Sequence, residues 1–318
     1  MTNKVLITGG AGYIGNQLVP RLLHDGYVIT VLDNLIHRQY GIMDNCYCEN
    51  FNFVYGDVRD KSLYGKLISK NDIIINLAAY VGMPICDRFP IEAKQVNQES
   101  SEFLASKVSK DQLIIFPNTN SGYGLGKHKK GKAVYCTEET PLHPISLYGK
   151  TKCDAEKVLM DTGTTTSLRL ATVMGISKRM RMDLLVNDFT WRAWKDKFIV
   201  LFESNFSRNF IHVKDVADAI EFTMARYNEM KGQVYNVGNT SANVNKMELC
   251  LAIKKQVPDF FITESPINKD PDQRNYIVSN EKIESLGWCP IYSLDKTISE
   301  LLKACPIIKN TNCSFADI

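Results

Sequence analysis

A glycine-rich turn near the beginning of the chain limits its possible folds more than any other feature. Gly9, Gly12 and Gly15 are spaced G-x-x-G-x-x-G, after a continuous apolar run at 4–8 and before a segment of helical periodicity at 13–25. In such a turn one glycine permits the sharp reversal, one lets the backbone approach a pyrophosphate, and one lets the helix pack close to the strand. The start of the helix adds free N–H groups and a partial positive charge for the phosphates. The motif therefore predicts a dinucleotide-binding βαβ unit.

An acidic residue marks the end of the second predicted strand. Asp33 follows the apolar run 27–32 and lies about 20 residues beyond the turn. A carboxylate there accepts hydrogen bonds from ribose hydroxyls and repels a 2′-phosphate, which predicts NAD rather than NADP. The nearby Arg38 would weaken that preference. The cofactor residues that we expect from this pattern are Gly9, Gly12, Tyr13, Ile14, Gly15, Asp33, Asp57, Val58, Ala78 and Ala79.

Strand-like and helix-like segments alternate over the first half of the chain. The predicted strands are 4–8, 27–32, 51–55, 72–77, 113–116 and 165–170, and the clearest helices after the first are 92–107 and 146–160. This order predicts an α/β fold with a doubly wound parallel sheet of the Rossmann type, whose ligands bind at the carboxyl ends of the strands. We expect an NAD-binding domain at 1–172, with elements returning to it around 208–240. A smaller, interleaved substrate lobe should occupy 173–305, and 306–318 should form a polar tail.

A tyrosine and a lysine four residues apart suggest the chemistry. Tyr148 and Lys152 lie on one face of a predicted helix. A nearby cation lowers the pKa of a phenol, which can then take a proton from a hydroxyl while a hydride leaves the same carbon. Thr119, after an earlier strand, supplies a hydroxyl that would orient the substrate oxygen. The three form a candidate catalytic set, and the alternative for the pair alone is a surface Tyr and Lys.

Composition excludes several other classes of protein. The chain has 318 residues, a net charge of +3 spread along its length, and nine cysteines without metal-ligand spacing. We therefore expect no metal site, no nucleic-acid partner and reduced thiols. The basic run 127–132 is interpreted as a solvated loop. No apolar stretch is long enough to cross a membrane and no signal peptide is visible, so we expect a cytoplasmic protein.

Seven segments together are similar to one known family. They are Gly9–Gly15, Leu32–Asn34, Gly56–Val58, Leu77–Ala79, Asn118–Gly124, Tyr148–Lys152 and Arg208–Val216. They resemble the extended short-chain dehydrogenase/reductases, specifically the NAD-dependent epimerase/dehydratase group that modifies nucleotide sugars, over about residues 3–303.

The resemblance implies roles for individual residues. Tyr148 would be the base, Lys152 its partner and a ligand of the nicotinamide ribose, and Thr119 the hydrogen-bonding partner of the reacting hydroxyl. It adds Asn34, Leu77, Asn97, Tyr148 and Lys152 to the expected cofactor residues. It also implies a nucleotide-diphosphate sugar as substrate and a homodimer or higher homo-oligomer. The expected substrate residues are Tyr80, Asn120, Ser121, Arg179, Arg181, Asn187, Arg208 and Arg274, although each arginine could instead be a solvated surface residue.

Two positions depart from the family's dehydratases. Sugar 4,6-dehydratases carry an acid pair directly after the catalytic Thr, and here those positions hold Asn120 and Ser121. Neither side chain can act as a general acid near neutral pH, which argues against dehydration. Oxidation at C4 remains, by a C4-epimerase or by a 4-dehydrogenase that releases the ketone.

Two further segments, Ala79–Cys86 and Leu168–Gly175, resemble a branch from bacterial surface-polysaccharide clusters. One type in that branch oxidises GDP-linked heptose at C4. Other readings stay open: a 4,6-dehydratase or decarboxylase of the same family, and a non-catalytic NAD-binding sensor. Additional acid/base roles are conceivable, with packing roles favoured, for Tyr80, Cys86, Tyr123 and His143.

Overall fold

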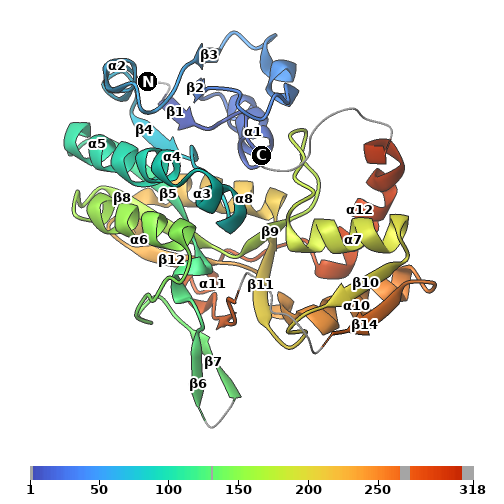
Figure 1. Ribbon diagram of the computed structural model, residues 1–318. Helices are drawn as coiled ribbons and strands as arrows, with labels where there is room; N and C mark the ends of the chain where they lie inside the picture. The colour runs from blue at the N-terminus through green and yellow to red at the C-terminus, as the bar shows by residue number, and fades with distance from the viewer. Residues whose placement is uncertain (1–2, 130–131, 266–272, 310–318) are drawn as a thin grey trace.

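A parallel sheet forms the centre of the molecule in the computed structural model, which describes residues 3–129, 132–265 and 273–309. Figure 1 shows this sheet with helices on both sides. All its neighbouring strands are parallel. Their order is β12 (Val234–Val237), β8 (Thr165–Leu170), β5 (Leu113–Thr119), β4 (Ile73–Asn76), β1 (Lys4–Thr8), β2 (Val28–Asp33) and β3 (Phe51–Tyr55). The predicted doubly wound sheet is confirmed.

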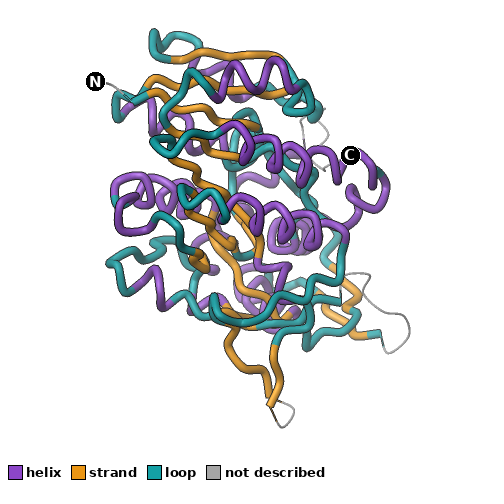
Figure 2. Tube along the Cα trace, turned by 90° about the vertical axis from the view of Figure 1, so that its left-hand side faces the viewer, coloured by secondary structure: helices purple, strands orange, loops and turns teal. Residues whose placement is uncertain are grey.

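Helices cover both faces of this sheet and explain why its strands are continuously apolar. On one face lie α1 (Gly15–His24) and α8 (Val213–Ala225), which share a core cluster with β1, β2 and β12. On the other face lie α2 (Lys61–Ile68), α5 (Ser100–Lys107) and α6 (Leu147–Met160). In Figure 2 the strands run through the middle of the molecule between these layers.

A smaller lobe follows the sheet and is interleaved with it, as expected. Its own core joins α7 (Leu185–Lys195), α10 (Lys246–Gln256), α12 (Leu294–Lys309) and the parallel pair β10 (Phe198–Leu201) and β14 (Phe261–Glu264). A small sheet connects the lobe to the main domain through β9 (Thr172–Met174), β11 (Ser207–His212) and β13 (Asn243–Asn245).

The remaining elements are short. They are α3 (Met83–Arg88), α4 (Pro90–Lys94), α9 (Tyr227–Met230), α11 (Glu281–Glu284), a π-helix Gln95–Glu99, and the 3₁₀ segments Gly41–Asn45, Asn120–Tyr123 and Thr240–Ala242. Within the three described ranges, no helix is long and apolar enough to span a membrane.

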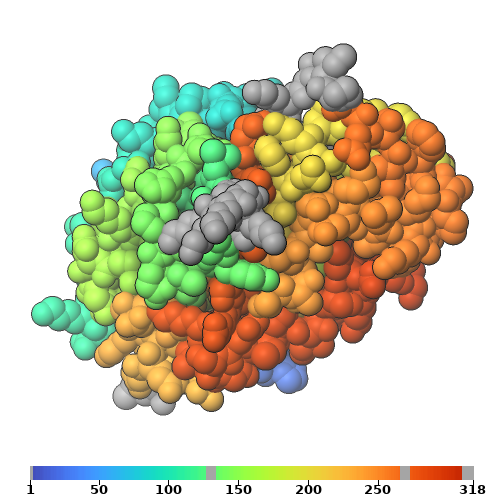
Figure 3. Space-filling view, turned by 90° about the horizontal axis from the view of Figure 1, so that it is seen from below, coloured from blue at the N-terminus to red at the C-terminus, as the bar shows by residue number. Residues whose placement is uncertain are grey.

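Three segments differ from expectation. The run 127–132, expected as a loop, begins a hairpin in which β6 (Lys127–Lys129) pairs antiparallel with β7 (Lys132–Cys136). The far end of β7 also pairs with the distant β15 (Ile277–Val278). This pairing brings residues of the middle and the end of the chain side by side on the face seen in Figure 3. The predicted helix 92–107 is α4, a π-helix and α5 in succession. Helix α12 runs to Lys309, into the expected tail, of which 310–318 lie outside the described residues.

Candidate active site

The glycine turn lies where the direction of the sheet order reverses. β1 pairs with β2 on one side and with β4 on the other, so the loops after β1 and β4 diverge and leave a crevice. Gly9 has φ +68°, and a Cβ there would lie 2.7 Å from the backbone nitrogen of Ala78 in the loop after β4. A residue with a side chain would therefore push these two loops apart.

The other two motif glycines have different surroundings. A Cβ on Gly15 would lie 2.2 Å from the carbonyl oxygen of Gly10, so glycine is required for α1 to pack against the turn. A Cβ on Gly12 would meet Gly9 O alone, at 3.0 Å, and Gly12 lines the cavity. The missing side chain at Gly12 leaves the room that a pyrophosphate needs at the start of α1.

Asp33 closes the base of the turn. Its carboxylate oxygens accept hydrogen bonds from Ala11 N at 3.0 Å and from Leu35 N at 2.8 Å. Burial raises the pKa of Asp33, while these two hydrogen bonds and the positive charge of Arg179 act in the opposite direction. The carboxylate is held in the cavity wall beside the turn, and it keeps lone pairs that fit ribose hydroxyls. Arg38 is exposed and does not line the cavity.

The end of β3 supplies a second carboxylate. Asp57 accepts a hydrogen bond from Asn34 at 3.0 Å and forms an ion pair with Arg59 at 2.8 Å. Burial alone would raise the pKa of Asp57, but the hydrogen bonds from Arg59 and Asn34 lower it. The hydrogen bond from Asn34 to Asp57 ties the loop after β2 to the loop after β3 along the cavity edge.

Tyr148, Lys152 and Thr119 line the same cavity. Helix α6 carries the first two, and its N-cap Ser146 accepts a hydrogen bond from Gly149 N. Thr119 ends β5 and is close enough to Tyr148 to lower the pKa of its phenol. The Lys152 ammonium donates to Pro117 O at 2.8 Å. The predicted catalytic set is thus brought together at the carboxyl end of β5.

The electrostatics of this set differ from expectation. Burial raises the pKa of Tyr148 to about 12, and the positive charges that oppose this are Arg181 and Arg274, where the sequence suggested Lys152. Burial lowers the pKa of Lys152 to about 7. Loss of contact with water is the cause, because the contacts of the Lys152 nitrogen with Pro117 O and, at 3.9 Å, with the centre of the Phe116 ring both favour the charged form.

The segment between β9 and α7 lines part of the cavity and is tied to the glycine turn. Tyr13 OH donates to Gly175 O at 2.5 Å, and Ser177 Oγ donates to Tyr13 O at 2.8 Å. Asn187 was expected to bind substrate. It is fully buried instead, accepting from Gly175 N at 3.0 Å and donating to Arg181 O at 2.7 Å. Asn187 therefore positions this segment.

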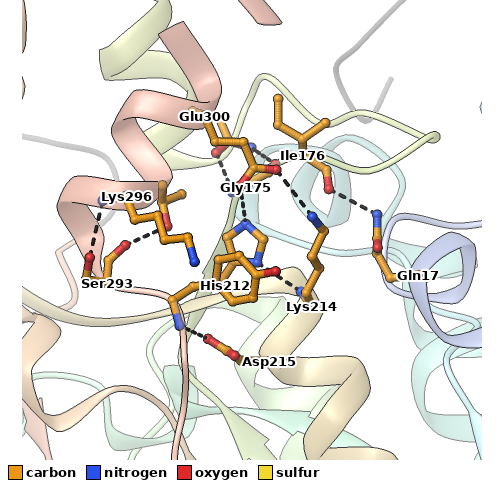
Figure 4. A network of polar contacts seen from close by, with 12 residues as sticks. Gln17, Gly175, Ile176, His212, Lys214, Asp215, Ser293, Lys296 and Glu300 are labelled. Carbon is orange, nitrogen blue, oxygen red and sulfur yellow. Dashed lines mark hydrogen bonds and ion pairs between the residues drawn. The ribbon is translucent and has the colours of Figure 1, made fainter. Parts of the chain in front are cut away.

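A buried histidine supports the same segment from below, as Figure 4 shows. His212 Nδ1 accepts from Lys214 N at 3.1 Å, and Nε2 lies 3.0 Å from a carboxylate oxygen of Glu300. A Cβ on Gly175 would lie 2.2 Å from His212 Nε2, so the backbone rests directly on the ring. Helix α12 of the small lobe is thereby connected to the wall of the cofactor cavity.

The structure separates the predicted residues into two groups. Those that line the cavity are Gly9, Gly12, Tyr13, Ile14, Gly15, Asp33, Asn34, Asp57, Val58, Leu77, Ala78, Ala79, Tyr80, Thr119, Tyr148, Lys152, Arg179, Arg181 and Arg274. The predicted residues that do not line it are Asn97, Asn120, Ser121, Asn187 and Arg208. Asn120 and Ser121 are buried in the turn after β5, and Arg208 lies behind the cavity-lining Tyr276, 5.7 Å from its ring centre.

Comparison with known proteins agrees with this geometry. The sequence model of the NAD dependent epimerase/dehydratase family matches residues 5–238. The chain belongs to that family. Similar curated proteins include dTDP-L-rhamnose 4-epimerase of Burkholderia thailandensis, 29% identical over 94% of this chain and 93% of its own length. UDP-glucose 4-epimerase of Lactobacillus helveticus is 27% identical over 90% and 92%.

Solved structures of the epimerase/dehydratase family have the same fold. UDP-glucose 4-epimerase of Thermotoga maritima, with UDP-glucose, superposes with a TM-score of 0.81 at 26% identity, covering 96% of this chain and all (100%) of that one. A UDP-glucuronic acid 4-epimerase of Bacillus cereus has a TM-score of 0.83 at 22% identity, covering 96% and 99%. This chain is an NAD-dependent enzyme of a family that modifies nucleotide sugars.

Several cavity residues of this epimerase-family enzyme were missed by sequence reasoning. Tyr276 and Leu184 come from the small lobe, and His37 follows β2 without a recognisable motif. Val81 and Gly82 extend the loop after β4, and their position next to Ala78–Ala79 was a signal that could have found them. Among the described residues, no three His, Cys, Asp or Glu side chains gather as a metal site.

Proposed function

We propose that this enzyme oxidises the C4 hydroxyl of a nucleotide-linked sugar. The observation that carries the proposal is that Tyr148, Thr119 and Lys152 line one cavity with the glycine turn, and Thr119 is close enough to Tyr148 to lower the pKa of its phenol. The family uses NAD, which when bound accepts a hydride from the sugar carbon. Gly12 and Asp33 provide the space and the carboxylate that such a dinucleotide requires.

The side chains of the set have distinct tasks in this reaction. Tyr148 takes the proton of the C4 hydroxyl as the carbon loses its hydride, leaving a ketone. Thr119 holds the sugar oxygen within reach of Tyr148. Arg181 and Arg274 stabilise the phenolate that Tyr148 must become before it can act as a base. Lys152, buried beside Pro117 O, would contact the nicotinamide ribose.

The acids in the cavity wall argue against dehydration. Among the described residues, the carboxylates that line the cavity are Asp33 and Asp57, at the ends of β2 and β3. Both are on the glycine-turn side, where the cofactor's adenosine would bind. Neither Asn120 nor Ser121 supplies a general acid beside Thr119. The geometry therefore favours a 4-epimerase or a 4-dehydrogenase over a 4,6-dehydratase.

The arginines of the cavity support an anionic substrate. Arg181 is held by Asp183 through contacts of 2.5 and 3.2 Å, and Arg274 reaches the turn after β5. Guanidinium groups bind diphosphates through paired hydrogen bonds. We propose a nucleotide-diphosphate sugar as substrate, with a GDP-linked heptose of surface-polysaccharide synthesis as one candidate. The positive charge of Arg179 lowers the pKa of Asp33, so Arg179 is nearer to the expected cofactor site than to the substrate site.

A substrate panel tests the proposal. Purified protein would be incubated with NAD and GDP-, UDP-, CDP- and dTDP-sugars, including GDP-linked heptose, and followed by NADH absorbance and product NMR. Stoichiometric NADH with a 4-keto product identifies a dehydrogenase, and a C4-inverted sugar without net NADH identifies an epimerase. A 4-keto-6-deoxy product, or full activity of Tyr148→Phe, would refute the proposal.

A further inference from the structure

We propose that Ser121 and Arg274 form a hydrogen-bond relay that polarises the Thr119 hydroxyl toward the sugar oxygen. The inference rests on the proposed function, because it assumes that Thr119 contacts the reacting oxygen. It changes the role of Ser121, which the sequence suggested as a substrate contact. Ser121 is fully buried and does not line the cavity, so it acts through its neighbours as a positioning residue.

A continuous chain of polar contacts carries the relay. Arg274 Nη1 donates to Ser121 Oγ. Thr119 Oγ1 donates to Ser121 Oγ at 2.9 Å, and Ser121 N donates to the Thr119 oxygen at 3.1 Å. Thr119 in turn is close enough to Tyr148 to lower the pKa of that phenol. The chain of hydrogen bonds thus runs from a guanidinium of the small lobe to Thr119, beside the candidate catalytic base.

The donors and acceptors of this chain allow two states. A guanidinium can only donate, so Ser121 Oγ must accept from Arg274. In the first state, which the structure shows, Thr119 also donates to Ser121, and Thr119 faces the sugar as an acceptor, which suits an alcohol. In the other state Ser121 donates to Thr119, and the Thr119 proton points to the sugar oxygen, which suits a ketone. Rotation about the side-chain bonds of Thr119 and Ser121 interconverts the two states.

The charge of Arg274 favours a change from the first state to the second as the ketone forms. A cation that occupies a lone pair of Ser121 Oγ makes the Ser121 O–H a stronger donor, and hydrogen bonds in a chain strengthen one another. The Thr119 proton is thereby directed at the oxygen on which negative charge develops as the hydride leaves. Donors preorganised in this way stabilise the transition state more than the bound substrate. The relay should therefore affect kcat rather than KM.

The substitution Ser121→Ala tests the relay on the sugar nucleotide that the wild-type enzyme turns over in the panel. We expect kcat to fall about 10–100-fold. KM for the sugar nucleotide and the Kd of NADH should stay within about twofold, because Ser121 touches neither ligand. A C4-deuterated substrate should show a larger isotope effect on kcat in this variant, because hydride transfer becomes more rate-limiting. Ser121→Thr, which keeps the hydroxyl, should recover most of the activity.

Controls separate this inference from the proposed function. Ser100→Ala removes another buried hydroxyl, one that donates to Val96 O at 2.6 Å, and should leave kcat unchanged. A wild-type kcat in Ser121→Ala, or a raised KM at unchanged kcat, would overturn the relay. Activity in Tyr148→Phe would instead overturn the proposed function. An inactive Tyr148→Phe with a fully active Ser121→Ala would refute the relay alone.

Discussion

Tyr80 and Asn97 hold each other by two hydrogen bonds. Tyr80 N donates to Asn97 Oδ1 at 2.8 Å, and Asn97 Nδ2 donates back to Tyr80 O at 3.0 Å. Asn97 lies in the π-helix Gln95–Glu99, and such a bulge re-aims a side chain out of the regular helical path. The side chain therefore fixes the cavity loop after β4 without lining the cavity itself.

Replacing Asn97 should weaken cofactor binding through this loop. Asn97→Asp keeps the acceptor but loses the donor, and Asn97→Leu loses both. We expect NADH to bind roughly tenfold more weakly in Asn97→Leu, with a loss of about 1–3 kcal/mol in the free energy of unfolding. Fluorescence titration and urea unfolding measure the two effects. Gln98→Ala, on the same π-helix, is the control. Equal losses of NADH affinity in Gln98→Ala and Asn97→Leu would contradict a role of the Tyr80–Asn97 hydrogen bonds in cofactor binding.

Two glycines of the turn should respond differently to alanine. Gly15→Ala places a Cβ 2.2 Å from a backbone oxygen, so the free energy of unfolding should fall by about 1–3 kcal/mol. Gly12→Ala meets one atom at 3.0 Å and should fold, but the methyl group would occupy the space for a pyrophosphate. Thermal unfolding with and without NAD distinguishes these cases. Strong NAD stabilisation of Gly12→Ala would contradict our placement of the pyrophosphate.

Asp33→Asn should change the cofactor preference. The amide keeps the shape of the side chain but loses the charge that repels a 2′-phosphate. Loss of charge-assisted hydrogen bonds of about 1.5–3 kcal/mol predicts roughly 10–100-fold weaker NAD binding. NADP binding should improve relative to NAD. Isothermal titration with both dinucleotides measures the ratio, and an unchanged ratio would place Asp33 outside the ribose site.

The two buried arginines of the 175–184 segment should have separable roles. Arg179 acts on Asp33, so Arg179→Ala should weaken NAD about tenfold and leave KM for the sugar nucleotide nearly unchanged. Arg181 acts on Tyr148, so Arg181→Ala should lower kcat or raise KM while NAD binding persists. Dinucleotide titration and steady-state kinetics on both variants measure these effects. Weaker NAD binding in Arg181→Ala, or a changed KM in Arg179→Ala, would contradict the assignment.

The pH dependence of stability should carry a signature of Lys152. Burial lowers its pKa to about 7 from an ordinary 10.5. Between these values the folded protein binds fewer protons at Lys152 than the unfolded chain does, so this group makes stability rise with pH, by up to about 1.4 kcal/mol per pH unit. Below pH 7 the full cost of burying the charge remains. Lys152→Met should remove this slope, and urea unfolding of both proteins from pH 7 to 10 measures the difference.

Local pattern was enough to predict the main domain. The run Lys4–Thr8, the glycine turn and the periodic segment after it each prescribe one backbone conformation, and burial between two helix layers requires continuous apolar strands. The position of Thr119 and Tyr148 after strands or at helix starts placed them at one edge of the sheet. Spacing could not show that β7 pairs with β15, because β15 is remote in sequence. The hairpin of β6 and β7 at 127–132 was also not predicted.

The sequence by itself determined a dinucleotide fold with a Tyr, Lys and Thr set, because glycine geometry and helix periodicity are local properties. Tertiary structure alone decided which polar residues face the cavity. Asn97, Ser121 and Asn187 have suitable chemistry for ligand binding, yet their hydrogen bonds to Tyr80, Thr119 and Arg181 make them supports. The tertiary structure also decided which charges surround Tyr148. Electrostatic interactions depend on distance and burial, and both are set by packing between segments far apart in the chain.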